Sequence, residues 1–84
     1  MTVKELEKKV WDQDRVRIVL RDRSMATVGK YTYQKAVQET WSIKKFLDNR
    51  INRLVNDKEV VVLDGKGEIA HRGTLLKTIR LSYN

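Results

Sequence analysis

The sequence predicts an α+β fold, a small single domain over residues 1–84 with the element order α-β-β-α-β-β and room for one further C-terminal strand. Residues 15–21 alternate apolar and cationic side chains at period two, which is typical of a half-buried strand. Apolar side chains recur at helical spacing after residue 42, and a β-branched run over residues 60–63 precedes Asp64 and Gly65, a strong hairpin signal. We therefore expect an antiparallel sheet packed on one main helix.

The first element is a predicted helix over residues 3–11. Thr2 and Glu5 fit a capping box, in which a hydroxyl and a carboxylate three residues apart satisfy each other's backbone N–H groups. The apolar side chains that follow form one narrow helical stripe, so this helix has to pack on something larger. Residues 12–14, with the sequence Asp-Gln-Asp, are expected to end the helix as an acidic turn.

The next two elements are predicted strands, over residues 15–21 and 26–33. The first hides its apolar side chains on one face and holds three arginines on the other, namely Arg15, Arg17 and Arg21. The second is rich in β-branched and aromatic residues and is expected to pair with the first, with Gly29 at a bulge or a close backbone approach. For residues 31–41 the pattern leaves strand, loop and helix open.

The main helix has two interpretations. One begins near Tyr33 and runs to residue 56, which places Lys44 within the apolar stripe and leaves Phe46 outside it. The other begins at Ser42 as N-cap, which removes the lysine from the core and brings the phenylalanine in. In both, residues 56–57 end the helix, and the apolar stripe of the second half is the firmer part of the prediction.

The C-terminal third is predicted as strands. Residues 60–63 read as a strand buried on both faces, followed by a turn over residues 64–67 and a returning strand over residues 68–72. Gly73 is expected at a bulge, and residues 75–81 alternate as a further strand. Leu76 falls out of phase with that alternation, which marks either an outward apolar patch or a shift of register.

Composition limits the classes of protein to which this chain could belong. The formal net charge is +7, with 40% hydrophobic and 35% charged residues, a composition typical of a soluble globular protein. The longest apolar run has four residues, too short for a membrane span, and the N-terminus lacks the apolar core of a signal peptide. The absence of cysteine excludes a disulfide framework and thiolate chemistry, so we expect a cytoplasmic protein. Because the apolar runs are short, we also expect no membrane partner.

Residues that could support catalysis are sparse. His71 is the only histidine, and Glu68, three residues away, would lie on the opposite face of a strand. Residues 64–67 read Asp-Gly-Lys-Gly, but they lack the length and following helix of a phosphate-binding loop, so a hairpin turn is the better interpretation. We expect a protein that is not an enzyme and has no metal, cofactor or small-molecule substrate.

The positive charge favours a nucleic-acid partner, DNA or RNA. The positive excess is spread along the chain, so a cationic surface has to be assembled by folding. Strand arginines beside tyrosine rings suit phosphates and bases, and a cationic helix offers more contacts. The candidate residues are Arg15, Arg17, Arg21, Tyr31, Tyr33, Lys44, Lys45, Arg50 and Arg53. The competing interpretation is a solvated charged surface that serves solubility, with both tyrosines under the helix.

A second hypothesis is a protein-binding adaptor or inhibitor of the kind carried by phages and mobile elements. Its surface would be an exposed strand edge over residues 74–82 or a helix face with Trp41, and the same edge would allow a homodimer. Trp11, Trp41 and Phe46 are large side chains that a small core needs, so we expect all three inside it. No helix-turn-helix, ribbon-helix-helix or winged-helix pattern matches the predicted order of elements.

Overall fold

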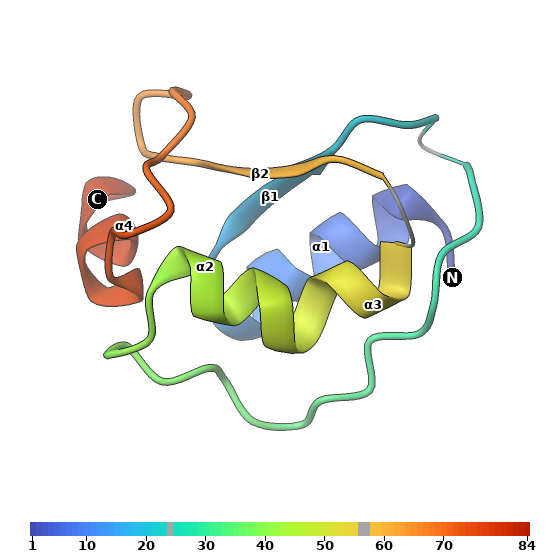
Figure 1. The fold of residues 1–84 in the computed structure, drawn as a ribbon, viewed down its shortest axis with the longest axis horizontal. Helices are drawn as coiled ribbons and strands as arrows, with labels where there is room; N and C mark the ends of the chain where they lie inside the picture. The colour runs from blue at the N-terminus through green and yellow to red at the C-terminus, as the bar shows by residue number, and fades with distance from the viewer. Residues whose placement is uncertain (24, 56–57) are drawn as a thin grey trace.

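A two-stranded antiparallel sheet lies among helices in the computed structural model, which describes residues 1–23, 25–55 and 58–84 (Figure 1). The described elements are, in chain order, α1 (Val3–Asp14), β1 (Arg17–Leu20), α2 (Ile43–Phe46), η1 (Leu47–Ile51), α3 (Asn52–Val55), β2 (Val60–Leu63) and α4 (Leu76–Ser82). Because α2, η1 and α3 follow one another without a break, they form one helix over residues 43–55. The α+β class is confirmed, but the order is α-β-α-β-α rather than α-β-β-α-β-β.

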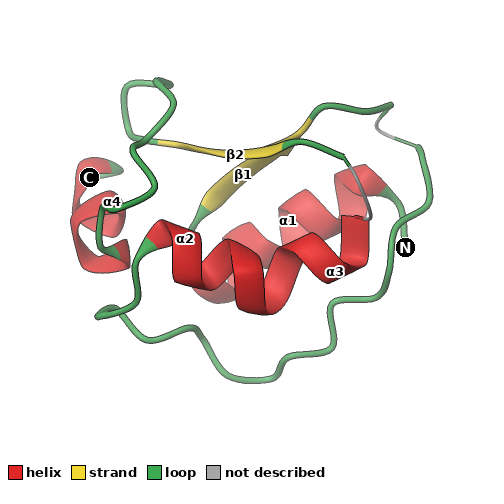
Figure 2. Cartoon of the chain, viewed as in Figure 1, coloured by secondary structure: helices red, strands yellow, loops and turns green. Residues whose placement is uncertain are grey.

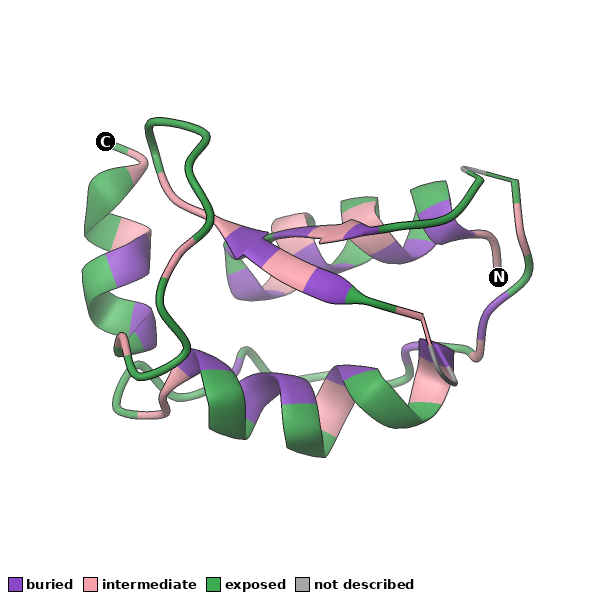
Figure 3. Ribbon diagram, turned by 45° about the horizontal axis from the view of Figure 1, so that its top comes forward, coloured by how far each residue is buried: buried purple, intermediate pink, exposed green. Residues whose placement is uncertain are grey.

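The core lies between the sheet and the helices. Figure 2 shows α1 and the helix over residues 43–55 beneath the two strands, α4 at one end, and a long connection from β1 to α2 around the outside. The buried positions of α1 and of the longer helix face inward in Figure 3. No helix in the described ranges combines the length and the apolar character needed to cross a lipid bilayer.

Helix α1 begins as predicted and extends three residues further. The Thr2 hydroxyl accepts the Glu5 N–H at 3.2 Å, and the Glu5 carboxylate accepts the Thr2 N–H at 3.0 Å, which confirms the capping box. The prediction that residues 12–14 form an acidic turn is wrong, because the helix continues through them. Asp12 pairs with a lysine one turn earlier in the helix, and Asp14 has hydrogen-bond partners inside the fold. The helix ends at Arg15, which adopts the left-handed conformation with φ 56°.

Strand β1 pairs with β2. Four apolar side chains of this pair face the core, Ile18 opposite Val62 and Leu20 opposite Val60. Arg17 is exposed on the other face, so the period-two burial pattern is confirmed. The predicted bounds of residues 15–21 are too wide, because the strand is Arg17–Leu20 and Arg15 is the left-handed C-cap of α1. The prediction that β2 is buried on both faces is wrong for its outer face, where Val61 and Leu63 are half-buried.

The strand predicted over residues 26–33 is wrong. This segment is extended but makes only one isolated bridge, between Thr27 and Thr2, because its backbone groups bond to other parts of the fold. The Val28 N–H donates to the carbonyl of Met1, and the Gly29 N–H donates to the carbonyl of Leu54 at 2.8 Å. A Cβ on Gly29 would lie 3.3 Å from the Leu54 Cα, which confirms the close backbone approach.

The main helix begins at Ser42, so the interpretation that begins near residue 33 is wrong. The Ser42 hydroxyl accepts the Lys45 N–H at 3.1 Å, as expected of an N-cap. The helix buries five side chains, which are Ile43, Phe46, Leu47, Ile51 and Val55. From residue 43 to residue 55, buried side chains recur every four residues, whereas an α-helix has about 3.6 residues per turn. The π-helical segment η1 is wound more loosely than an α-helix, so it keeps these side chains on one face of the helix. The predicted end at residues 56–57 lies outside the described residues.

The hairpin turn after β2 is confirmed, but little of the returning strand is present. The Asp64 carbonyl accepts the Gly67 N–H at 3.0 Å, and Gly67 takes a left-handed φ of 79°. Residues 68–72 make one isolated bridge, between Leu63 and Ile69. Gly73 lies in a turn after His71 rather than at a bulge, since its N–H donates to the His71 Nδ1 at 3.0 Å.

The last predicted strand, over residues 75–81, is wrong because this segment is helix α4. Leu76 and Ile79 are buried three positions apart, whereas Leu75 and Leu81 are exposed. Leu76, which is out of phase with the alternation of the predicted strand, is therefore the residue that anchors the helix in the core. The strand edge expected over residues 74–82, one of the two surfaces considered for an adaptor and the one considered for a homodimer, is absent with it.

Candidate nucleic-acid interface

Four aromatic side chains reach the surface, and each has a cation over its ring. Trp11, Trp41, Tyr33 and Tyr83 are half-buried, so the expectation that both tryptophans lie wholly inside the core is wrong. Seven cation–ring contacts lie within 6 Å in the described residues. A cation within about 6 Å of a ring centre is attracted by the ring, so each of these contacts also favours the folded arrangement.

The first group of these side chains, here called the Trp11 cluster, comprises Trp11, Arg15, Arg17, Arg80 and Tyr83. The two aromatic rings meet edge to face with their centres 5.1 Å apart. The Cζ of Arg15 lies 5.7 Å from the Trp11 ring centre, and the Cζ of Arg17 lies 5.3 Å from it. Cations and rings from α1, β1 and α4 thus converge on one small region.

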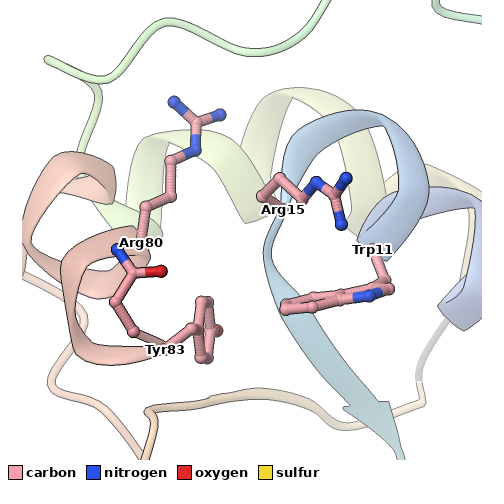
Figure 4. A pocket seen from close by; sticks show the side chains of 5 residues that line it. Trp11, Arg15, Arg80 and Tyr83 are labelled. Atoms are coloured by element: carbon pink, nitrogen blue, oxygen red, sulfur yellow. The ribbon is translucent and has the colours of Figure 1, made fainter.

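A pocket of about 350 Å³ opens within this cluster. It is lined by Trp11, Arg15, Arg80, Tyr83 and Asn84, none of which is acidic (Figure 4). In Figure 4 the guanidinium groups of Arg80 and Arg15 project to the same side of the two rings. A pocket with cations on one side and aromatic surface on the other suits a ligand that is both anionic and planar.

Three constraints hold the Trp11 cluster in place. The Tyr83 hydroxyl accepts the Arg17 N–H at 3.0 Å and donates to the Leu63 carbonyl at 2.6 Å, so it closes the end of the β1–β2 ladder. Burial raises the pKa of this hydroxyl above its usual value, so it stays a donor. Arg80 donates to the carbonyls of Asp14 and Val37 at 2.9 and 2.8 Å. The third constraint is the left-handed C-cap at residue 15, which turns the chain from α1 into β1.

The second group, here called the Trp41 cluster, comprises Tyr33, Trp41, Lys45, Arg50 and Arg53. The Nζ of Lys45 lies 4.6 Å from the Trp41 ring centre. The Cζ atoms of Arg50 and Arg53 lie 4.4 and 5.5 Å from the Tyr33 ring centre. This ring is fixed by its hydroxyl, which donates to the Asn49 carbonyl at 3.2 Å. Lys45 and Arg53 are exposed, so both are open to a partner.

Asp14 is buried between the two clusters. Its carboxylate accepts the Tyr31 hydroxyl, the Val37 N–H at 2.8 Å and the Arg50 Nη1 at 3.3 Å. The prediction that Tyr31 projects beside the strand arginines is therefore wrong, because its ring is only 2% exposed. Burial and the neighbouring carboxylate raise the pKa of Tyr31 above its usual value. Arg50 has a side chain only 13% exposed, so its guanidinium is largely committed to the interior.

Two other predicted site residues are paired on the surface. Arg21 lies 3.3 Å from Glu59, and Lys44 lies 3.0 Å from Asp48. Neither belongs to the Trp11 or the Trp41 cluster. Each already has a carboxylate partner, so it offers less to an anion than an unpaired arginine does.

Sequence reasoning missed the two rings of the Trp11 cluster and Arg80. The sequence favours a core position for Trp11, Arg80 falls in the segment predicted as a strand, and Tyr83 follows that segment and has no predicted role. One signal was available, because Trp11 and Arg15 are four residues apart and share a helix face once α1 is continued to residue 14. Tyr83 is brought to Arg17 by tertiary packing, for which the sequence has no local signal.

No protein family, curated protein or solved structure matches this chain. Within the described residues, no three histidine, cysteine or acidic side chains gather as a metal ion would require.

Proposed function

We propose that this protein is a non-enzymatic module that binds nucleic acid through the Trp11 cluster. The proposal rests mainly on one observation, that Arg15 and Arg17 are exposed and form no ion pair with any carboxylate in the described parts of the chain. Both lie over the ring of Trp11, and Arg15 also lines the pocket, whose lining has no acidic side chain.

The chemistry of the cluster fits a nucleotide better than it fits other anions. A guanidinium over an aromatic ring keeps its N–H donors directed outward, where they can bind a phosphate in a bidentate manner. The exposed parts of Trp11 and Tyr83 offer aromatic surface on which a base can stack, a contact that contributes about 1–3 kcal/mol per base. A simple anion such as sulfate would use the arginines but gain nothing from the rings.

Solubility alone is a weaker account of these charges. Solubility requires charge but no particular placement, and attraction between a cation and a ring accounts for one cation at each ring. Here cations from two different elements, Arg15 after α1 and Arg17 in β1, meet at one ring. Holding these cations in place costs side-chain entropy, and a partner that uses both cation and ring accounts for that arrangement.

The test compares two double variants of equal charge change. Arg15→Gln with Arg17→Gln removes two cations from the Trp11 cluster, whereas Lys4→Gln with Lys30→Gln removes two exposed cations outside both clusters. Fluorescence anisotropy with labelled DNA and RNA oligonucleotides at low salt measures the affinity. We expect the arginine variant to bind at least about tenfold more weakly and the lysine variant to stay within about threefold of wild type. Equal losses in the two variants would contradict a localised site.

A further inference from the structure

The Trp11 and Trp41 clusters meet at Asp14. Arg50, which lies over the ring of Tyr33, donates to the Asp14 carboxylate, and Arg80, which lines the Trp11 pocket, donates to the Asp14 backbone carbonyl at 2.9 Å. A single residue therefore separates the inner ends of the two clusters.

The same two arginines also hold one stretch of the loop before α2. Arg50 donates to the Lys35 carbonyl at 3.0 Å, and Arg80 donates to the Val37 carbonyl at 2.8 Å. Gln13, from the last turn of α1, donates to the Lys35 carbonyl as well. The side chain of Lys35 is itself exposed, so a cation lies on the short stretch between the clusters. The two clusters are thus joined through the buried Asp14 and the loop that carries Lys35, and the exposed group between them is this one cation.

We infer that the partner is a single-stranded nucleic acid that crosses both clusters. This inference rests on the proposed function and adds the class of nucleic acid. Four partly exposed rings are of use only to bases whose faces are free, and a duplex keeps its base faces stacked inside. A duplex would engage the cations through its phosphates and leave the aromatic surface unused.

The exposed cations of the two clusters and the connecting loop supply the phosphate contacts. They are Arg15, Arg17, Lys35, Lys45 and Arg53. The domain measures 30 × 25 × 21 Å, and small domains that bind single strands cover about 4–16 nucleotides. A strand of about twelve nucleotides is therefore long enough to reach both clusters, and one of about four nucleotides is expected to occupy one cluster at a time.

The two tryptophans allow each cluster to be observed separately. In Trp41→Phe the fluorescence of Trp11 reports on its own cluster, and in Trp11→Phe the fluorescence of Trp41 reports on the other. Each variant is titrated with unlabelled single strands of about four and about twelve nucleotides, as DNA and as RNA, and with a hairpin duplex of equal phosphate number. We expect the longer single strand to quench the remaining tryptophan of each variant, at a half-saturating concentration lower than that of the shorter strand with the same variant. We expect the duplex and the shorter strand to bind about tenfold more weakly or worse.

The outcomes separate this inference from the proposed function. A duplex that binds as tightly as the single strand, or quenching of Trp11 alone at saturation, overturns the single-strand path while nucleic-acid binding stands. No binding of any oligonucleotide at low salt overturns both. A preference for DNA or for RNA supports the path and identifies the sugar that the site accepts.

A second variant covers the case in which a tryptophan substitution unfolds the chain. Lys45→Gln with Arg53→Gln changes only exposed side chains of the Trp41 cluster. We expect it to weaken binding of the longer single strand about tenfold, while the control Lys4→Gln with Lys30→Gln changes it less than about threefold. If the two variants bind the longer strand equally well, the Trp41 cluster is not part of the path.

Discussion

Arg17 lies over Trp11, with its Cζ 5.3 Å from the centre of the indole ring. The two residues belong to different elements, since Trp11 is in the last two turns of α1 and Arg17 begins β1. The left-handed C-cap between them folds the chain back on itself, and the Tyr83 hydroxyl holds the backbone of Arg17 at 3.0 Å. A cation and a ring that are six positions apart thereby become one exposed surface, on which the proposed function depends.

The ring of Trp11 is expected to contribute to binding independently of the arginines. Trp11→Ala removes the aromatic surface and leaves Arg15 and Arg17 in place, and we expect it to weaken oligonucleotide binding by about 1–3 kcal/mol. Trp11→Phe keeps an aromatic face and is the matched variant, with a loss about half as large or less. Anisotropy titrations measure both, with circular dichroism to show that the fold is retained. Identical affinities for the two variants would mean that no base stacks there.

The buried carboxylate of Asp14 is expected to be critical to folding. Asp14→Ala leaves the Tyr31 hydroxyl, the Val37 N–H and the mostly buried Arg50 without their acceptor. Loss of one partner of a buried charged pair costs about 3–5 kcal/mol. Urea denaturation measures the free energy of unfolding, and Asp48→Ala, which breaks an exposed pair with Lys44, serves as control at about 1 kcal/mol or less. A similar small loss for both variants contradicts a central role for Asp14.

Stability is expected to fall at high pH because of Tyr31. Burial and the hydrogen bond to Asp14 raise its pKa in the folded protein, whereas the unfolded chain ionises near the ordinary value of about 10. The stabilisation is therefore complete below about pH 10 and is lost as the pH rises above it, by up to about 1.4 kcal/mol per pH unit. Urea denaturation between about pH 8 and 11 measures this loss. Tyr31→Phe is expected to remove part of the slope, and an unchanged slope would rule out this residue as its source.

The packing of α4 is tested by two adjacent leucines. Leu76 is fully buried, so Leu76→Ala is expected to lower the free energy of unfolding by about 2–5 kcal/mol. Leu75 is 37% exposed, and Leu75→Ala is expected to cost clearly less. A strand over residues 75–81 would reverse this order, because Leu75 would then face inward. Thermal or urea unfolding of the two variants therefore decides between the helix and the strand.

Local patterns predicted the parts of the fold that depend on local chemistry. The sequence predicts the capping box at Thr2, the N-cap at Ser42 and the period-two pattern around strand Arg17–Leu20, because each needs only neighbouring residues. The strands predicted over residues 26–33 and 75–81 are wrong for two different physical reasons. The first has β-branched residues, but its backbone groups bond to the N-terminus and to Leu54. The second segment alternates apolar and polar residues as a strand does, but it forms a helix because a helix buries both Leu76 and Ile79.

The candidate site was predicted in its cations and in one of its rings, that of Tyr33. Arg15, Arg17, Lys45 and Arg53 were named from charge and spacing, and all four lie over aromatic rings. The rings of the Trp11 cluster were missed because half-burial of a tryptophan depends on packing that no local pattern encodes. Tyr31 was misplaced because its partner, Asp14, is seventeen positions away and was assigned to a turn.

The salt dependence of oligonucleotide binding tests the central claim most directly. Anisotropy titrations of the wild-type chain and of Arg15→Gln with Arg17→Gln, from low to near-physiological salt, give the slope of log affinity against log salt. The account predicts a linear fall for the wild type and a slope smaller by about 1.4 in the variant, since each phosphate contact to a single strand contributes about 0.7. The same slope in both proteins, or no binding by the wild type at low salt, would contradict it.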